Sequence, residues 1–254
     1  DVGRGRQSRR RHARGEGRRQ VEIGQAGGFP PDHPWIQAAR ILESSVPLLA
    51  QTPEWSRQGH LLLARCYAQL GEPARELSTL RRLVAADTTA PESRMALAQA
   101  LEARGEFTDA LSEYRLVASK TPELTLAMAR VEALASMRPG GTEPRWSEVD
   151  KRIDAAEKGL PDSPRVPILR AETLAARGRG GDARTVLEKA RAAHPKQVDL
   201  WLASIDLARA QGRADEIPAL LAAATAKDAC GDRVELRLAR AQHLAIRSPD
   251  NVSK

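Results

Sequence analysis

The amino-acid sequence predicts an all-α fold in which helix pairs recur along the chain. Residues that favour helices, chiefly Ala, Leu, Arg and Glu, dominate the composition. Residues that favour strands are scarce, and only 3% of the chain is aromatic. Glycines recur at a fixed interval, because Gly71 and Gly105 lie 34 residues apart, as do Gly178 and Gly212. Together these observations favour a repeated all-helical unit.

The first segment, residues 1–28, is rich in arginine and is expected to be a disordered tail. Eight arginines in residues 1–20, against two acids, account for +6 of the net charge of +7. Such a tail could bind nucleic acid or an anionic membrane, although no aromatic residue precedes Phe29 for base stacking. A linker from an upstream domain and an out-of-place translated start are the alternatives. The arginines assigned to polyanion binding are Arg9, Arg10, Arg11, Arg14, Arg18 and Arg19.

Residues 29–56 are predicted to be a partial repeat that caps the N-terminal side of the array. Within 34–51, apolar residues follow one another at helical spacing. They are Ile41, Leu42, Val46 and Leu49. This segment matches the second helix of a pair that lacks its first.

Five repeats are predicted between residues 57 and 231. Their bounds are 57–90, 91–124, 125–163, 164–197 and 198–231. The third is longer, because the prolines Pro122, Pro161 and Pro195, each expected to close a helix, are spaced by 39 and 34 residues. The five extra residues are assigned to the Gly- and Pro-rich stretch 138–144, where we expect a bend.

The repeated unit resembles the tetratricopeptide repeat, whose 34 residues carry small, aromatic, Gly and Pro positions in a fixed order. The unit 91–124 carries the pattern most fully. Its matching residues are Leu97, Ala98, Leu101, Gly105, Ala110, Tyr114 and Pro122. The unit 125–163 is the most divergent, because Glu132 stands where a small residue is usual. Five units in phase make the resemblance specific over about 175 residues.

The resemblance implies a right-handed solenoid of stacked antiparallel helix pairs, a tetratricopeptide-like superhelix. Small residues such as Ala98 and Ala110 let helix backbones approach, and larger apolar residues fill the space around them. Turn glycines suit the end of a helix, where φ often becomes positive. Each pair buries its apolar face only by stacking on its neighbours.

Residues 232–254 are predicted to be a C-terminal capping helix and tail. Val234, Leu238 and Ala239 are expected to face inward, and arginines such as Arg237 and Arg240 outward. A lone last helix with a charged outer face is what a solenoid cap requires. The alternative is a chain cut from a longer array.

The family usually binds extended peptides or a helix on the concave face that its first helices line. The resemblance therefore implies a partner-binding groove for a protein or peptide. Counted from the turn glycines, the polar residues expected in this groove are Arg65, Gln99, Glu102, Glu172, Asp206 and Arg209. The alternative is that they are solvated helix faces. The family's carboxylate clamp is not expected, because Arg65 is followed by Gln99 with no Asn partner.

No catalytic residues, metal ligands or cofactor are predicted. The five histidines are scattered, with no triad-like or metal-ligand spacing, and Cys66 and Cys230 lie far apart. Cys66 is expected in the core, and Cys230 in a loop where a reactive thiol is a possibility. Packing is favoured over ligand stacking for the four tryptophans. No apolar run is long enough to span a membrane.

The leading functional hypothesis is a non-catalytic protein–protein interaction scaffold. The alternatives are a nucleic-acid-associated adaptor that uses the tail, and the repeat portion of a larger enzyme such as a glycosyltransferase or kinase. The chain begins with Asp1, so the compartment stays open, with the cytoplasm favoured. The oligomeric state stays open too. The preference for Arg over Lys suggests a GC-rich bacterial genome.

Overall fold

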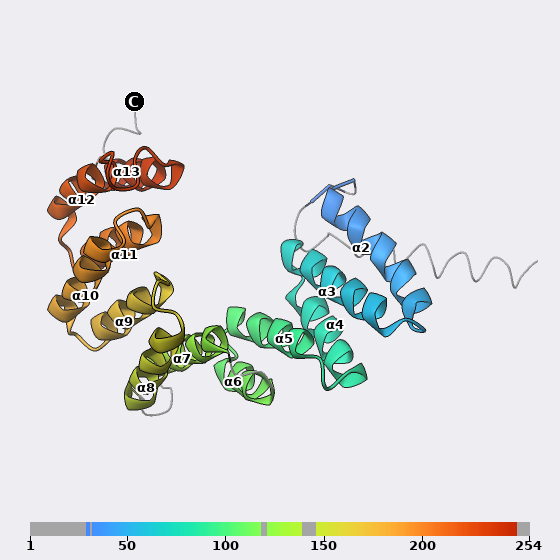
Figure 1. Cartoon of the computed structure of the whole chain (residues 1–254). Helices are drawn as coiled ribbons and strands as arrows, with labels where there is room; N and C mark the ends of the chain where they lie inside the picture. Colours follow the sequence, from blue (N-terminus) through green and yellow to red (C-terminus); the bar gives the residue numbers. More distant parts are fainter. Residues whose placement is uncertain (1–28, 31, 118–120, 139–145, 248–254) are drawn as a thin grey trace, which may run out of the picture. The chain divides into compact units, whose positions relative to one another are not determined.

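The computed structural model describes residues 29–30, 32–117, 121–138 and 146–247. The chain divides into two compact units, unit 1 (Asp1–Ser119) and unit 2 (Lys120–Lys254). Within the described ranges every regular element is a helix and there is no strand (Figure 1). The predicted all-α architecture of stacked helix pairs is confirmed.

Unit 1 is a run of helices in which each contacts the next along the chain. Its elements are α2 (Pro34–Ser45), the 3₁₀ helix η1 (Val46–Leu49), α3 (Pro53–Gln69), α4 (Pro73–Ala86), α5 (Pro91–Ala103) and α6 (Phe107–Leu116). Four of these helices begin with proline, which lacks only an N–H that the first turn leaves unpaired in any case. The sequence therefore marks the start of most helices in this unit.

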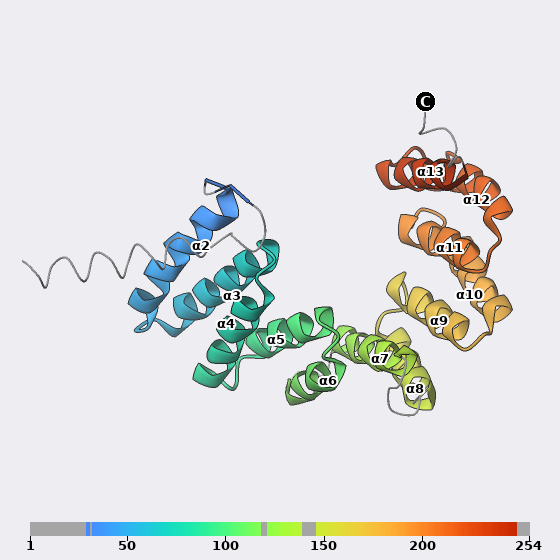
Figure 2. The ribbon, with the colours of Figure 1, turned by 180° about the vertical axis from the view of Figure 1, so that it is seen from behind.

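Unit 2 continues the same alternation of first and second helices. Its elements are α7 (Pro122–Met137), α8 (Trp146–Gly159), α9 (Arg165–Ala176), α10 (Gly180–Ala193), α11 (Val198–Ala210), η2 (Ala214–Glu216), α12 (Ile217–Ala224) and α13 (Val234–Arg247). Both views place α9, α11 and α13 in one row and α10 and α12 in another (Figures 1 and 2). Successive first helices also contact one another, α7 with α9, α9 with α11 and α11 with α13. Unit 2 thus presents a face built from first helices.

The turn within four of the helix pairs is the same hydrogen-bonded motif. Its glycines, Gly71, Gly105, Gly178 and Gly212, have φ between 69° and 77°. In each case the N–H after the glycine donates to the carbonyl five residues earlier, and the glycine N–H donates three residues back. This is the Schellman ending of a helix, which needs a left-handed residue at the glycine position. The 34-residue glycine spacing therefore has a conformational cause.

Small residues bring the paired helices together. Ala98, Ala110 and Ala183 are fully buried, and Ala171 is nearly so. Larger apolar side chains surround them; in unit 2 one such cluster joins Ala171 and Ala183 to Leu187 and Leu200. That cluster links α9, α10 and α11, so burial depends on stacking between pairs.

The divergent residue of the third predicted repeat has a local partner. Glu132 on α7 is buried, and Arg152 on α8 donates to its carboxylate at 2.8 Å. The pair of α7 and α8 also retains buried small residues, because Ala129 and Ala133 on α7 share a core cluster with Ala156 on α8. The expected bend at 138–144 lies, apart from Arg138, outside the described residues.

Two predictions are wrong: that Pro122 ends a helix, and which face of the last helix is buried. Pro122 does not close a helix but begins α7, where the N-cap Thr121 accepts a hydrogen bond from the N–H of Leu124. On α13, Val234 and Leu238 are exposed rather than buried, while Leu236 and His243 are buried with Ala239. The helix is rotated from the expected register, so its outward face is partly apolar rather than uniformly charged.

Candidate binding groove

One sequence position recurs on the exposed side of four first helices. Arg65, Gln99, Glu172 and Asp206 each stand six residues before a turn glycine, and all four are exposed. Because the turn geometry is shared, these side chains leave equivalent points of their helices. The same position carries Arg or Gln in unit 1 and an acid in unit 2.

In unit 2 the structure brings Glu172 and Asp206 to one hollow, which we call the first-helix hollow. It has a volume of about 610 Å³ and is formed mainly by α9 and α11, with Met137 at the end of α7. Its apolar lining consists of Met137, Ile168, Ala171, Ala175, Ala176, Leu187, Leu202, Ala203, Leu207 and Ala210. Alanines predominate there, and their short side chains leave space between the two helices.

Three carboxylates are the charged groups of the hollow: Glu172 on α9, and Asp199 and Asp206 on α11. Although the Glu172 side chain as a whole is exposed, partial burial of its carboxyl raises its pKa, and the positive charge of Arg130 on α7 partly opposes that shift. Asp199 lies in the first turn of α11, where a negative charge also favours the helix. The hollow is therefore an apolar surface flanked by acids.

Two predicted groove residues lie differently from the others. Arg209 does not line the hollow. It lies about one turn after Asp206 on α11, and its guanidinium donates a hydrogen bond to the Asp206 carboxylate at 2.6 Å. Glu102 is only 9% exposed and accepts a hydrogen bond from the hydroxyl of Tyr114, 3.4 Å away on the second helix of its own pair. Glu102 thus belongs to the contact between α5 and α6 rather than to an open face.

The pocket of unit 1 that involves its first pair is polar. It has a volume of about 250 Å³ and includes Glu43, Tyr67 and Arg75. Arg75 donates to Glu43 at 2.6 Å and to Glu72 at 3.0 Å, and its guanidinium stacks on Tyr67 at 4.5 Å. Burial and the hydrogen bond to Glu43 raise the pKa of Tyr67. The charged groups of Glu43 and Arg75 are paired with each other, so this pocket joins α2, α3 and α4.

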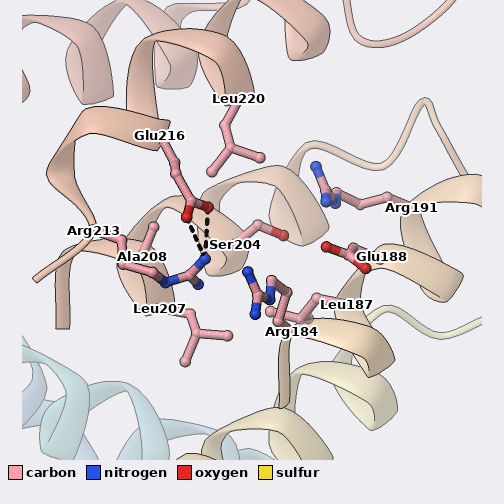
Figure 3. A pocket seen from close by; sticks show the side chains of 10 residues that line it. All are labelled: Arg184, Leu187, Glu188, Arg191, Ser204, Leu207, Ala208, Arg213, Glu216 and Leu220. Carbon is pink, nitrogen blue, oxygen red and sulfur yellow. Dashed lines mark hydrogen bonds and ion pairs between the residues drawn. The ribbon is translucent and has the colours of Figure 1, made fainter. Parts of the chain in front are cut away.

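A small pocket between α10, α11 and the η2–α12 segment is likewise a junction between repeats (Figure 3). Arg213 donates to both carboxylate oxygens of Glu216, at 2.7 and 2.6 Å, and to the Gln211 side chain. Arg191 stacks on Trp201 at 4.6 Å, and burial lowers the pKa of its guanidinium. The pocket's volume of about 30 Å³ is close to that of one water molecule. A second contact of this kind joins Arg177 to Trp146. The sequence analysis predicted neither of these Arg–Trp contacts.

Neither cysteine has the environment of a reactive thiol. Cys66 is buried, as predicted, and Cys230 is half-buried with its sulfur 3.4 Å from the carbonyl of Pro195. Burial raises the pKa of both thiols, which disfavours the nucleophilic thiolate. Trp55 is 61% exposed, so the packing role expected of all four tryptophans fails for this one.

Metal sites and membrane spans can be judged only over the described ranges. Within them, no group of three or more His, Cys, Asp or Glu residues is placed to hold a metal ion. No helix of the described part combines the length and apolarity that crossing a membrane requires. The six arginines assigned to polyanion binding, Arg9 to Arg19, lie outside the described residues and stay a prediction.

Comparison with known proteins agrees with this geometry. The family model described as tetratricopeptide repeat matches residues 168–209, which contain most of the first-helix hollow. The chain has the fold of tetratricopeptide-repeat proteins, and its segment 168–209 matches their family model. A comparison with curated proteins found no match.

Several solved tetratricopeptide-repeat structures share the fold. A protein from Parabacteroides merdae has a TM-score of 0.63 at 12% identity, covering 84% of this chain and 80% of its own. A protein from Thermus thermophilus has a TM-score of 0.55 at 21% identity, with coverages of 74% and 98%. PilW, a type IV pilus biogenesis factor, has a TM-score of 0.56 at 18% identity, with coverages of 80% and 90%. At these identities the similarity establishes the fold.

Proposed function

We propose that this tetratricopeptide-repeat protein is a non-catalytic scaffold that binds a segment of a partner protein in the first-helix hollow. The observation that carries the proposal is the apolar lining of the hollow on α9 and α11. Apolar surface exposed to water in a concave site favours association with apolar side chains of a partner. Helical-repeat proteins commonly use the surface of their first helices in this way.

The residues predicted for the groove divide between the two units under this proposal. Glu172 and Asp206 flank the hollow, and Arg209 acts on it through its ion pair with Asp206. Arg65 and Gln99 stand at the equivalent exposed position in unit 1 and are proposed as separate contacts there. Glu102 is withdrawn from the proposed site because the packing between α5 and α6 buries it.

A peptide library displayed on phage tests the proposal directly. Peptides selected on the full chain are then measured against Ala203→Trp, which fills the hollow, and against Ala222→Trp on α12, which does not line it. We expect Ala203→Trp to weaken binding at least about tenfold, because an indole occupies the space of the peptide's apolar side chains. Ala222→Trp should bind like wild type.

The controls make the result decisive. Circular dichroism must show that both variants remain helical with similar melting curves. If Ala203→Trp, still folded, retains the selected peptides at wild-type affinity, the hollow is not the binding site and the proposal is wrong.

A further inference from the structure

We infer that the first-helix hollow selects a basic amphipathic helix, with lysine or arginine beside a stripe of apolar residues. This inference rests on the proposed function and specifies its partner. It begins from the charges of the lining: all three charged residues that line the hollow are acids, Glu172, Asp199 and Asp206. A partner must therefore match an apolar floor and a negative rim at once.

The neighbouring cations leave much of this negative charge available. Arg209 pairs with Asp206, but both side chains are substantially exposed, at 33% and 68%, so water and salt weaken that pair. Arg130 on α7 does not line the hollow, and its positive charge lowers the pKa of Glu172 by less than burial raises it. Asp199 is exposed in the first turn of α11. Glu172, Asp199 and Asp206 therefore offer their charges at the edge of one apolar hollow.

The spacing along α11 favours a helical occupant. Asp199, Ala203, Asp206 and Ala210 follow one another at intervals of four, three and four residues, so they form one stripe along the helix, with Leu202 beside it. Asp199 and Asp206 are seven residues apart, which is about 10 Å along a helix axis. A second helix lying beside α11 can repeat that interval with cations at positions i and i+7 and apolar residues at i+3 and i+4.

The same charges argue against a polyanion in this hollow. Nucleic-acid phosphates would approach three carboxylates without a lining cation to receive them. The three arginines of the adjacent small pocket, Arg184, Arg191 and Arg213, do not line the hollow, and two of them are engaged there, Arg213 by Glu216 and Arg191 by Trp201. The hollow and the arginine-rich segment 1–28 therefore suit partners of opposite charge.

Two fluorescein-labelled helical peptides test this inference by fluorescence anisotropy with the full chain. Both carry the same Leu and Ala stripe; one has Lys at the flanking i and i+7 positions and the other has Glu. We expect the Lys peptide to bind at least about tenfold more tightly than the Glu peptide at physiological salt. This factor corresponds to the summed free energies of a few exposed ion pairs between lysines and the acids of the hollow. Its affinity should fall as salt concentration rises.

A charge-neutral variant locates the effect. Glu172→Gln, Asp199→Asn and Asp206→Asn together should weaken the Lys peptide about tenfold and abolish its advantage over the Glu peptide. The matched control removes the same charge from exposed positions outside the hollow, by Asp215→Asn, Asp228→Asn and Glu235→Gln. The control should bind the Lys peptide like wild type.

The outcomes separate this inference from the proposed function. Equal binding of the two peptides, lost in Ala203→Trp, overturns the charge preference and keeps the hollow as an apolar binding site. If both triple variants lose the Lys peptide equally, the preference reflects overall charge and the inference is wrong. Absence of binding by either peptide, or binding untouched by Ala203→Trp, overturns it as well, and in the latter case the hollow loses its assigned role.

Discussion

Units 1 and 2 are built from the same turn and the same helix pairing, yet they present different surfaces. Six residues before the turn glycine, unit 1 has Arg65 and Gln99, whereas unit 2 has Glu172 and Asp206. The pocket of the first pair in unit 1 is polar, with the charges of Arg75 and its partners satisfied internally. The hollow of unit 2 is apolar with acids at its edge.

This contrast separates the residues that make the fold from those that give each unit its surface. The turn glycines and the buried alanines are shared between the units, and the Schellman hydrogen bonds follow from them. The exposed position before the turn varies in charge without any change in that geometry. Changes at the shared residues should therefore cost stability equally in both units, and changes at the variable position should cost almost none.

The largest effect is expected from a charge placed at the shared small position. Ala98→Glu in unit 1 and Ala171→Glu in unit 2 put a carboxylate where 2% or less of the side chain is exposed. Each should lower the free energy of unfolding by more than about 3 kcal/mol, and Ala98→Glu should speed hydrogen exchange across several helices of unit 1. Ala103→Glu, at an exposed position, is the control. An unchanged melting curve for Ala98→Glu would contradict the packing described for α5.

A smaller and equal effect is expected at the turns. Gly105→Ala and Gly178→Ala place a Cβ on residues with φ of 74° and 77°, so each should cost about 1 kcal/mol of unfolding free energy. Gly181→Ala is the control, because Gly181 lies within α10 with open space at its Cβ and no positive φ. That variant should gain up to about 1 kcal/mol. Urea denaturation measures all three, and a Gly178→Ala protein as stable as wild type would refute the strain argument.

The smallest effect tests the position that differs between the units. The raised pKa of Glu172 means that its ionised form is less favourable in the folded state than in the unfolded state. Glu172→Gln should therefore increase stability slightly at pH 7, and this gain should disappear as the pH falls and the wild-type carboxyl becomes protonated. Gln99→Glu in unit 1, at an exposed position, should change stability by less than about 0.5 kcal/mol. Stability curves against pH for both variants distinguish the two environments.

The sequence was sufficient to predict the repeat because the residues that recur in it, the turn glycines, are required by the backbone conformation of the turn. Gly71, Gly105, Gly178 and Gly212 each fix a helix end, so counting back from them identifies the buried Ala98 and Ala171; Glu172 and Asp206 are exposed, and their role in a groove stays a prediction. The counting failed on α13, where no turn glycine follows within the described residues and the inward face was misplaced. It also failed at Glu102, because burial there depends on Tyr114, which the first helix does not reveal.

The hollow itself was less predictable than its acids. Its space arises from several alanines on α9 and α11 that face each other across two repeats, and single-helix periodicity does not show which of them meet. The arginine contacts to Trp201 and Trp146 were missed for a similar reason, since each joins elements from different helix pairs.

The exposed position before each turn glycine has a consequence for how such a protein changes over generations. A substitution there alters what the surface attracts while the Schellman hydrogen bonds, which use only backbone atoms, stay intact. Selection can therefore retune recognition one repeat at a time without passing through misfolded intermediates. The two units already differ at this position, with Arg65 and Gln99 in unit 1 and Glu172 and Asp206 in unit 2.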